Sequence, residues 1–331
     1  MDYATLINTQ KNFFNSNTTL PISFRIQQLK KLKTLIQQHE KEITAALFLD
    51  LRKPEMEAQL TEIMLVKDEI DLLIKKLPKW SKAKSVASPF PIFWPGKSKI
   101  YYEPYGSVLI MGPWNYPFLL VMSPLIGAIA AGNCCVVKPS EHSAHTAKLL
   151  TKIINENFAP EFVHALNVDA HEAHKILQEK FDYIFFIGGT RIGKIIMESA
   201  GRNLTPLTLE LGGKSPCIVD ASANLDFAAR RIVWGKMLNA EQTCIAPDYL
   251  LIQRSCKNVF IEKMLQVLKK YFGNNIQESR SFGRIINRQH YDRLTKLLHH
   301  EKIIFGGEVD ANELYISPTL VNDVTWQYLI M

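Results

Sequence analysis

The chain has 331 residues, of which 47% are hydrophobic, so it can bury a large core and is long enough for two domains. Its five cysteines are an odd number with no CxxC pair and no secretory signal, which argues against a disulfide framework and favours reduced thiols in the cytoplasm. The formal charge of +7 comes from Lys and Arg spread among Asp and Glu, so we expect no nucleic-acid partner.

The first hundred residues predict helices and then an arm. Apolar residues recur at helical spacing over residues 21–50, which indicates an amphipathic helix. A second helix is expected over residues 55–77, with Pro78 ending it. The stretch "SPFPIFWPGKSKIYYEPYG", Ser88–Gly106, is rich in Pro, Ser, Gly and aromatic residues, which predicts a loop entering an exposed hairpin arm near residues 95–106.

The uncharged segment Pro117–Val137 has a length that could span a bilayer. However, Pro124 lies in its middle, and "GN" at Gly132 and Asn133 separates the helix-like part from a β-branched run. These breaks favour a buried helix followed by a buried strand. We therefore expect no stable membrane span.

From residue 107 onward, short apolar strands alternate with helices, which predicts βαβ units and a parallel sheet covered on both faces. The expected fold is α/β: a doubly wound parallel-sheet dinucleotide-binding domain over residues 1–209, followed by a second α/β catalytic domain over residues 210–331. Ligands of such sheets bind at the carboxyl ends of the strands, so the strand-to-helix turns are the places to look for chemistry.

Two of these turns carry polar side chains. "GPWNYP" places Asn115 just before the helix that Pro117 opens, where its amide could stabilise an oxyanion or act as a simple cap. "VVKPSE" places Lys138 at a strand end, where it could pair with phosphate or ribose hydroxyls or serve a structural role. Glu141 favours the start of the next helix.

The next two turns are rich in glycine. In "FFIGGTRIG", Gly188 and Gly193 flank a strand-to-helix turn that could approach a pyrophosphate, although the spacing is not GxGxxG. In "LELGGKSP", Glu210 stands among apolar residues. A desolvated carboxylate holds its proton more tightly, which suits a general base, and pairing with Lys or Arg is the alternative.

"NAEQTCIAPDY" places Cys244 in a short polar turn between a helix and a strand. This thiol is either a nucleophile or a buried structural cysteine, and the stretch alone does not decide between them. The histidine pairs His142/His145 and His171/His174 lie in polar helices without an evident third ligand, so no metal site is expected.

Taken together and in this order, the four motifs "GPWNYPF", "VVKPSE", "LTPLTLELGGKSPCIVD" and "QTCIAPDY" resemble the aldehyde dehydrogenase superfamily, especially its class 3 or fatty-aldehyde dehydrogenase-like branch. The resemblance implies oxidation of a medium- or long-chain aliphatic or an aromatic aldehyde to a carboxylic acid with NAD or NADP. It further implies Cys244 as the nucleophile, Asn115 as an oxyanion donor and Glu210 as the base that activates water.

For the cofactor, the resemblance implies Lys138 and Glu141 near the adenosine ribose. It implies a GxxxxG turn, Gly188 to Gly193 with Gly189 between them, near the pyrophosphate. Leu211 completes the expected cofactor-binding set. A homodimer is implied for full-length relatives, with a C-terminal tail that completes its interface.

The sequence departs from the resemblance in two places. Glu241 stands where the family normally has glycine, so it adds a side chain where the backbone can need a positive φ, and its carboxylate, three residues from Cys244, would disfavour the thiolate. The chain also ends at "TLVNDVTWQYLIM", where relatives continue into an "EEIFGP"-like motif, which implies a C-terminally incomplete catalytic domain.

Two alternatives to an active aldehyde dehydrogenase remain open at this point. One is a catalytically inactive truncated remnant that retains at most nucleotide binding. The other is a CoA-acylating enzyme, which would not need the water-activating role of Glu210.

Overall fold

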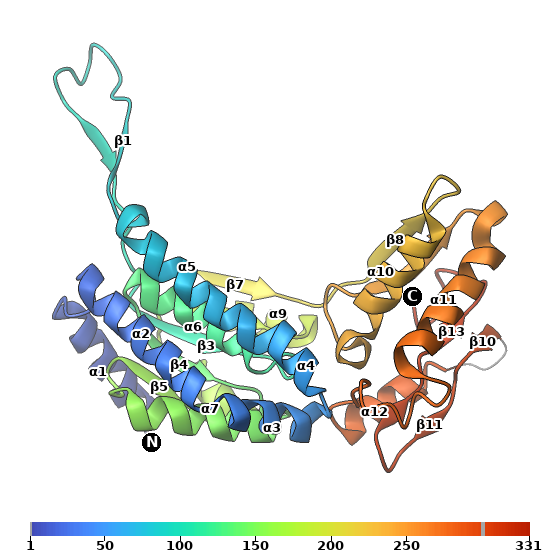
Figure 1. Ribbon diagram of the computed structural model, residues 1–331. Coiled ribbons are helices and arrows are strands. Elements are labelled where there is room, and N and C mark those ends of the chain that lie inside the picture. The colour runs from blue at the N-terminus through green and yellow to red at the C-terminus, as the bar shows by residue number, and fades with distance from the viewer. Residues whose placement is uncertain (1, 299–301) are drawn as a thin grey trace. The chain divides into compact units, whose positions relative to one another are not determined.

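The computed structural model describes residues 2–298 and 302–331, which form two compact units (Figure 1). Among the described residues, the first unit contains residues 2–43, 60–141 and 147–210, and the second contains residues 44–59, 142–146, 211–298 and 302–331. The predicted boundary at 209/210 lies one residue before the division at 210/211. Two short segments from the N-terminal half, however, group with the second unit.

The N-terminal helices differ from the sequence-based expectation in two details. The helix predicted over residues 21–50 is broken at His39 into α2 (Ile22–Gln38) and α3 (Glu40–Leu51). After α1 (Tyr3–Asn15), these are followed by α4 (Glu55–Ala58), a π-helical turn over residues 59–63, and α5 (Met64–Trp80). Pro78 does not end α5, because in the last turn its missing N–H costs a single hydrogen bond.

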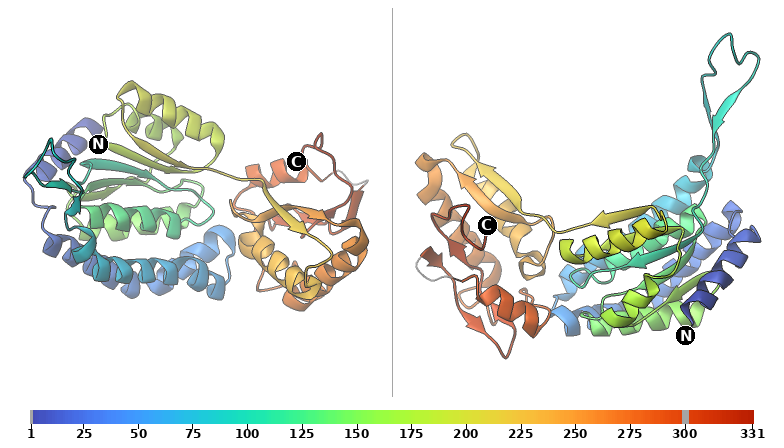
Figure 2. Two further views of the ribbon diagram at one scale, coloured as in Figure 1. Left: turned by 90° about the horizontal axis from the view of Figure 1, so that it is seen from above. Right: turned by 180° about the vertical axis from the view of Figure 1, so that it is seen from behind.

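A five-stranded sheet forms the centre of the first unit, and its neighbouring strands are all parallel, as the alternating pattern predicted. Helices lie against both faces of the sheet (Figure 2). Its order is β5-β4-β3-β6-β7, so the chain steps outward from β3 in one direction and then returns to build β6 and β7 on the other side. The strands are β3 (Ser107–Met111), β4 (Cys134–Lys138), β5 (Val163–Ala165), β6 (Tyr183–Ile187) and β7 (Leu207–Glu210).

Between these strands lie four helices: α6 (Leu119–Ala131), α7 (Ala144–Asn157), α8 (Ala170–Ile176) and α9 (Thr190–Arg202). The uncharged segment 117–137 is confirmed as a helix and a strand, since α6 ends at Gly132, whose φ of 99° few other residues adopt readily. No described helix is both long enough and apolar enough to cross a membrane.

The hairpin arm lies earlier in the chain than predicted. Its strands are β1 (Lys84–Val86) and β2 (Ser98–Ile100), which pair antiparallel, so the arm covers residues 84–100 rather than 95–106. The Pro-rich stretch is therefore the tip of the hairpin and not its entrance. The aromatic residues after Ile100 lead from the arm toward β3.

The second unit is also α/β, as predicted. Its parallel strands β8 (Ser215–Val219) and β9 (Pro247–Ile252) pack with α10 (Leu225–Met237) and α11 (Lys257–Phe272) around a shared apolar core. Short elements complete it: the 3₁₀ turns Leu238–Glu241 and Arg254–Cys256, α12 (Arg288–Thr295), β10 (Ile303–Phe305), β11 (Val309–Asp310), β12 (Tyr315–Ile316) and β13 (Leu320–Val321).

Acid should destabilise the second unit through Glu313. This carboxylate accepts from Arg284 at 2.6 Å and from Arg52 at 3.1 Å, and the hydrogen bond from Arg284 lowers the pKa of Glu313 below its usual 4.5. Because the folded-state pKa is depressed, the stability that the carboxylate contributes is present above pH 4.5 and is lost as the pH falls through the folded value. The free energy of unfolding of Glu313→Gln, measured with urea, should therefore depend less on pH than that of the parent chain between about pH 3 and about pH 6. Exposed Glu198→Gln is the control, and an equal change in both variants would contradict the role of the Arg284 contact.

Candidate active site

The candidate residues of the first unit meet at one edge of its sheet. In the strand register, Met111 at the end of β3 lies beside Lys138 at the end of β4, and Ile187 at the end of β6 lies beside Glu210 at the end of β7. The N–H groups of Gly112 and Gly188 reach across to the carbonyls of Lys138 and Glu210 at 3.0 Å. The structure thus brings Asn115, Lys138, the glycine turn and Glu210 to the same carboxyl edge.

The Asn115 turn is fixed by a buried carboxylate that sequence reasoning missed. Glu62 is fully buried, and its Oε2 accepts from the N–H groups of Phe118 at 2.9 Å and Leu119 at 3.1 Å. These are donors of the first turn of α6, which would otherwise lack partners. Asn115, half-buried three residues before Phe118, is therefore held at the start of a capped helix. An internal Glu inside a predicted helix gives no sequence signal of this role.

Lys138 and Glu141 form an ion pair in the turn after β4. The side chain of Lys138 is only 7% exposed, while that of Glu141 is 31% exposed. The pair places a charged donor and an acceptor together at the carboxyl edge of the sheet. Such a pair can bind sugar hydroxyls, which both donate and accept hydrogen bonds.

The glycine turn leads directly into α9 at the point where the sheet order reverses, between β3 and β6. Gly189 is the N-cap of α9, and no side chain caps this end of the helix. A Cβ on Gly188 would lie 2.4 Å from the ring of Phe186, whereas a Cβ on Gly189 would meet nothing within 4 Å. Gly188 is therefore required for packing, whereas Gly189 leaves open space at a helix N-terminus, where anions bind readily. Gly193 is buried within α9.

The expected desolvation of Glu210 is wrong. Its side chain is exposed at the end of β7, which is a strand of only four residues at the edge of the sheet. The apolar residues around Glu210 suggested a buried environment. However, β7 lies at the edge of the sheet and has a neighbouring strand on one side only, so its last side chain remains exposed. A base at this position would thus be solvated in this structure and able to exchange protons with water.

Cys244 belongs to the second unit, where it is exposed, and so is not a buried structural cysteine. Of the other thiols, all in the described part of the chain, Cys134, Cys135 and Cys256 are buried and Cys217 is partly buried. Burial raises the pKa of Cys134 to about 12 and that of Cys135 well above its usual range. Since the thiolate is the reactive form, accessibility favours Cys244 as the nucleophile.

The turn that carries Cys244 is anchored by Gln242, a second residue that sequence reasoning did not single out. The side-chain amide of Gln242 donates to the carbonyls of Asn239 and Arg284, both at 2.9 Å, and its Oε1 accepts from the N–H of Ile286 at 3.0 Å. Glu57 accepts from the N–H of Asn239 at 2.6 Å. These contacts tie the backbone that precedes the thiol to residues 284–286 and to Glu57, and the position of Gln242 two residues before Cys244 was the available signal.

The prediction that residue 241 needs a positive φ is confirmed. Glu241 has φ = 70°, and it follows Asn239 at 55° and Ala240 at 48°. Three consecutive residues other than glycine in the left-handed region are costly. An L-residue in that region is less stable than in the right-handed region by roughly 1–2 kcal/mol. Lys236 approaches the Glu241 carboxylate at 3.5 Å. Burial raises the pKa of Glu241 while Lys236 opposes the rise, and solvent at its 32% exposed side chain limits both effects.

The segment after Glu210 approaches the cysteine turn within the second unit. Leu211 is half-buried and begins this unit, and a Cβ on Gly213 would lie 3.0 Å from the carbonyl oxygen of Cys244. Lys214 pairs with Asp248, which follows Cys244 by four residues. A side chain at position 213 would thus press on the backbone of Cys244. Cys244 and Leu211 lie in one unit and the remaining candidates in the other, so their assembly into one site stays a prediction.

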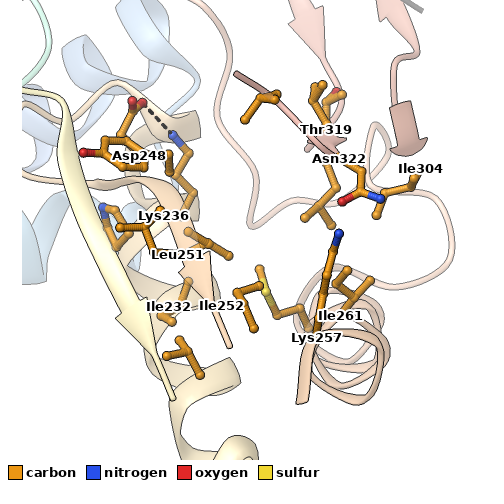
Figure 3. A pocket seen from close by; sticks show the side chains of 18 of the residues that line it. Ile232, Lys236, Asp248, Leu251, Ile252, Lys257, Ile261, Ile304, Thr319 and Asn322 are labelled. Atoms are coloured by element: carbon orange, nitrogen blue, oxygen red, sulfur yellow. Dashed lines mark ion pairs between the residues drawn. The ribbon is translucent and has the colours of Figure 1, made fainter. Parts of the chain in front are cut away.

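The second unit also has a pocket of about 740 Å³ (Figure 3). Its walls come from β9, α10, α11 and residues 318–331, and are mostly apolar, with Lys236 and Asp248 paired at 3.8 Å on one side. Glu241 belongs to its lining but Cys244 does not. The pocket and the accessible thiol of Cys244 therefore lie at different places in the second unit.

A doubly wound parallel sheet with an uncapped helix start at its switch point is the architecture of nucleotide-binding α/β enzymes. The chain belongs to the aldehyde dehydrogenase family, whose model matches residues 1–331, and it is therefore placed among the oxidoreductases.

Relatives and a solved structure agree with this assignment. The chain is 46% identical over 323 residues to the 4,4'-diaponeurosporen-aldehyde dehydrogenase of Staphylococcus aureus, covering 97% of this chain and 70% of the relative. It is 45% identical over 318 residues to the dimeric NADP-preferring aldehyde dehydrogenase of Canis lupus familiaris, covering 96% and 70%. The substrate-bound structure of Staphylococcus aureus AldH matches with a TM-score of 0.96 at 45% identity, covering 99% of this chain and 72% of that one.

Replacing Glu241 with glycine should stabilise the cysteine turn. Glu241→Gly removes the cost of a side chain at φ = 70°, so we expect a gain of about 1 kcal/mol in the free energy of unfolding of the second unit. Loss of the partly exposed Lys236 contact should offset at most a fraction of this gain. Urea unfolding measures the effect.

The matched control is Glu241→Ala, which removes the carboxylate but keeps the strain. Equal stability of the Gly and Ala variants would contradict the strain argument.

The same two variants test the effect of the Glu241 charge on Cys244. Iodoacetamide should alkylate Cys244 up to about fivefold faster in both variants, if removing the carboxylate stabilises the thiolate by up to about 1 kcal/mol.

Proposed function

We propose that this chain oxidises an aldehyde to a carboxylic acid with NAD or NADP. The observation that carries the proposal is the exposed Cys244 in an anchored turn, in a chain of the aldehyde dehydrogenase family. The names of the relatives support an aldehyde as substrate and NADP as one cofactor choice. We propose medium- or long-chain aliphatic or aromatic aldehydes as the substrate class.

The first steps of the proposed reaction belong to Cys244 and Asn115. The Cys244 thiolate adds to the carbonyl carbon, and the resulting oxyanion of the thiohemiacetal accepts hydrogen bonds from the Asn115 amide and the Cys244 N–H. The nicotinamide, when bound, supplies a hydride acceptor. Loss of hydride from the carbon leaves a thioester on Cys244.

Glu210 would carry the final step. It takes a proton from water as the water oxygen attacks the thioester carbon, and the carboxylic acid leaves as the Cys244 sulfur is released. Exposure of Glu210 at the end of β7 supports this role, since the attacking water has to reach it.

The cofactor would bind at the carboxyl edge of the first unit. Gly188, Gly189 and Gly193 would lie along the pyrophosphate at the uncapped start of α9, with Lys138 and Glu141 at the adenosine ribose and Leu211 beside the cofactor. The residues present fit the group, because an open helix N-terminus at a switch point suits a diphosphate.

A cytoplasmic location also belongs to this proposal. The homodimer is expected for full-length relatives, and the dog relative is described as dimeric. The five cysteines are all unpaired, which supports a reducing compartment.

The direct test is reduction of NAD or NADP by the purified chain with decanal or benzaldehyde. Cys244→Ala should abolish turnover, while Cys217→Ala, the matched removal of a partly buried thiol, should retain it.

Asn115→Ala should lower kcat by about 10²–10³-fold. Glu210→Gln should keep a first burst of reduced cofactor and lose steady turnover, because only hydrolysis is blocked. Turnover by Cys244→Ala would refute the mechanism.

The cofactor site has its own test. Gly189→Val should leave the fold unchanged, because a Cβ there meets nothing within 4 Å and φ is −78°, but it should weaken NAD(P) binding by more than about tenfold by filling the space a pyrophosphate needs. Gly201→Val, at the other end of α9 and equally open, is the control. Calorimetry measures the affinity. Nucleotide binding without any turnover in the parent chain would favour the inactive remnant over the enzyme.

A further inference from the structure

The turn that carries Cys244 begins with a strained run of backbone. Asn239, Ala240 and Glu241 have φ values of 55°, 48° and 70°, which residues other than glycine rarely adopt. Asn239 and Ala240 are also buried, at 2% and 6% exposure. Such a conformation persists only where the surrounding structure holds it. The contacts of this run therefore determine where the backbone of Cys244 lies.

Glu57 supplies a hydrogen bond at the first residue of the run. Its Oε1 accepts from the N–H of Asn239 at 2.6 Å. The acceptor is a carboxylate, and hydrogen bonds to ionised acceptors are about twice as strong as those to neutral ones. Glu57 is half-buried in α4, whereas Glu55 in the same short helix is exposed. Loss of the Glu57 carboxylate would deprive a buried N–H of this acceptor, which is unfavourable.

Further hydrogen bonds fix the position of Glu57 relative to the turn. The N–H of Arg284 donates to the carbonyl of Leu51 at 2.8 Å, shortly before α4 along the chain. The carbonyl of Arg284 accepts from the side-chain amide of Gln242, and this amide also donates to the carbonyl of Asn239, both at 2.9 Å. Together with the bond from Asn239 to Glu57, these contacts close a ring within the second unit.

The N–H of Cys244 is the group whose place depends on this ring. Within the part of the chain that the structure describes, this N–H donates to no acceptor, and Cys244 is exposed. An oxyanion donor must lie about 2.7–3.1 Å from the oxyanion, and a displacement of about 1 Å can cost about 10²-fold in rate. A small shift of the turn would therefore slow addition to a carbonyl more than a reaction that needs only an accessible thiol.

We propose that Glu57 is a positioning residue for Cys244, acting through its hydrogen bond to the Asn239 N–H and not through its charge. The proposal rests on the proposed function only in taking Cys244 as the nucleophile and its N–H as an oxyanion donor. Loss of the hydrogen bond lets the left-handed run relax toward the right-handed region. This relaxation turns the peptide planes before Cys244 and displaces its N–H.

The test compares two reactions of the Cys244 thiol that need no cofactor. p-Nitrophenyl acetate acylates the thiolate through an oxyanion and releases nitrophenolate, whereas iodoacetamide alkylates it by displacement of iodide without an oxyanion. In Glu57→Ala we expect acylation to slow by about tenfold or more and alkylation to change by less than about threefold. The rates of Cys244→Ala are subtracted, and urea unfolding checks that each variant is folded.

Two further variants separate the hydrogen bond from the charge, and they decide the question even if Glu57→Ala does not fold. Glu57→Gln keeps an acceptor oxygen without the charge, so its acylation should stay within about threefold of the parent rate. Glu57→Asp keeps the charge but withdraws the acceptor by one methylene, so its acylation should slow by about tenfold. Glu55→Ala, which removes the exposed carboxylate of α4, should leave both reactions unchanged.

Three results would overturn the proposal: parent-like acylation in Glu57→Asp, equal slowing in Glu57→Gln and Glu57→Asp, or a parent chain without Cys244-dependent acylation. Reduction of NAD or NADP with decanal is measured separately. If acylation follows the expected pattern but the chain shows no turnover with decanal, the proposed function fails while the positioning role of Glu57 stands.

Discussion

The candidate chemistry of the first unit depends on one constraint, the parallel direction of all five strands of its sheet. Because β3, β4, β6 and β7 run the same way in register, the residues that follow them emerge at one edge. The chain therefore needs no long loop to collect an amide, a lysine, a glycine turn and a carboxylate. The reversal of strand order between β3 and β6 then separates the first two turns from the last two, and this gap is where a ligand fits in such sheets.

Local patterns in the sequence were enough to predict that edge. The apolar strand Cys134–Lys138, the glycine at 132 and the alternation of strand and helix each depend on neighbours a few residues away, so their outcome follows from period and turn chemistry. The motifs could be placed on strand ends for the same reason. The positive φ of residue 241 was expected for a different reason, because the resemblance implies glycine at that position.

Features that depend on distant contacts could not be predicted. Residues 44–59 group with the second unit because Asp50 accepts from the N–H groups of His145 and Thr146 and the Leu51 carbonyl accepts from Arg284, across gaps of more than 90 residues. The exposure of Glu210 follows from the edge position of β7, which no local pattern reveals. Likewise Glu62 and Gln242 act on segments that only folding brings to them.

The shielding of the other thiols has a practical consequence for handling the protein. Oxidants convert accessible thiolates first to sulfenic acid and then irreversibly to sulfinic acid, whereas thiols packed in β4 are protected. Storage in air would therefore damage Cys244 while the sheet of the first unit stays intact. An aged sample would keep its circular dichroism and its unfolding transition and yet lack the thiol on which the proposed reaction depends. A count of titratable thiols under native conditions would distinguish such a sample from a chain that never had activity.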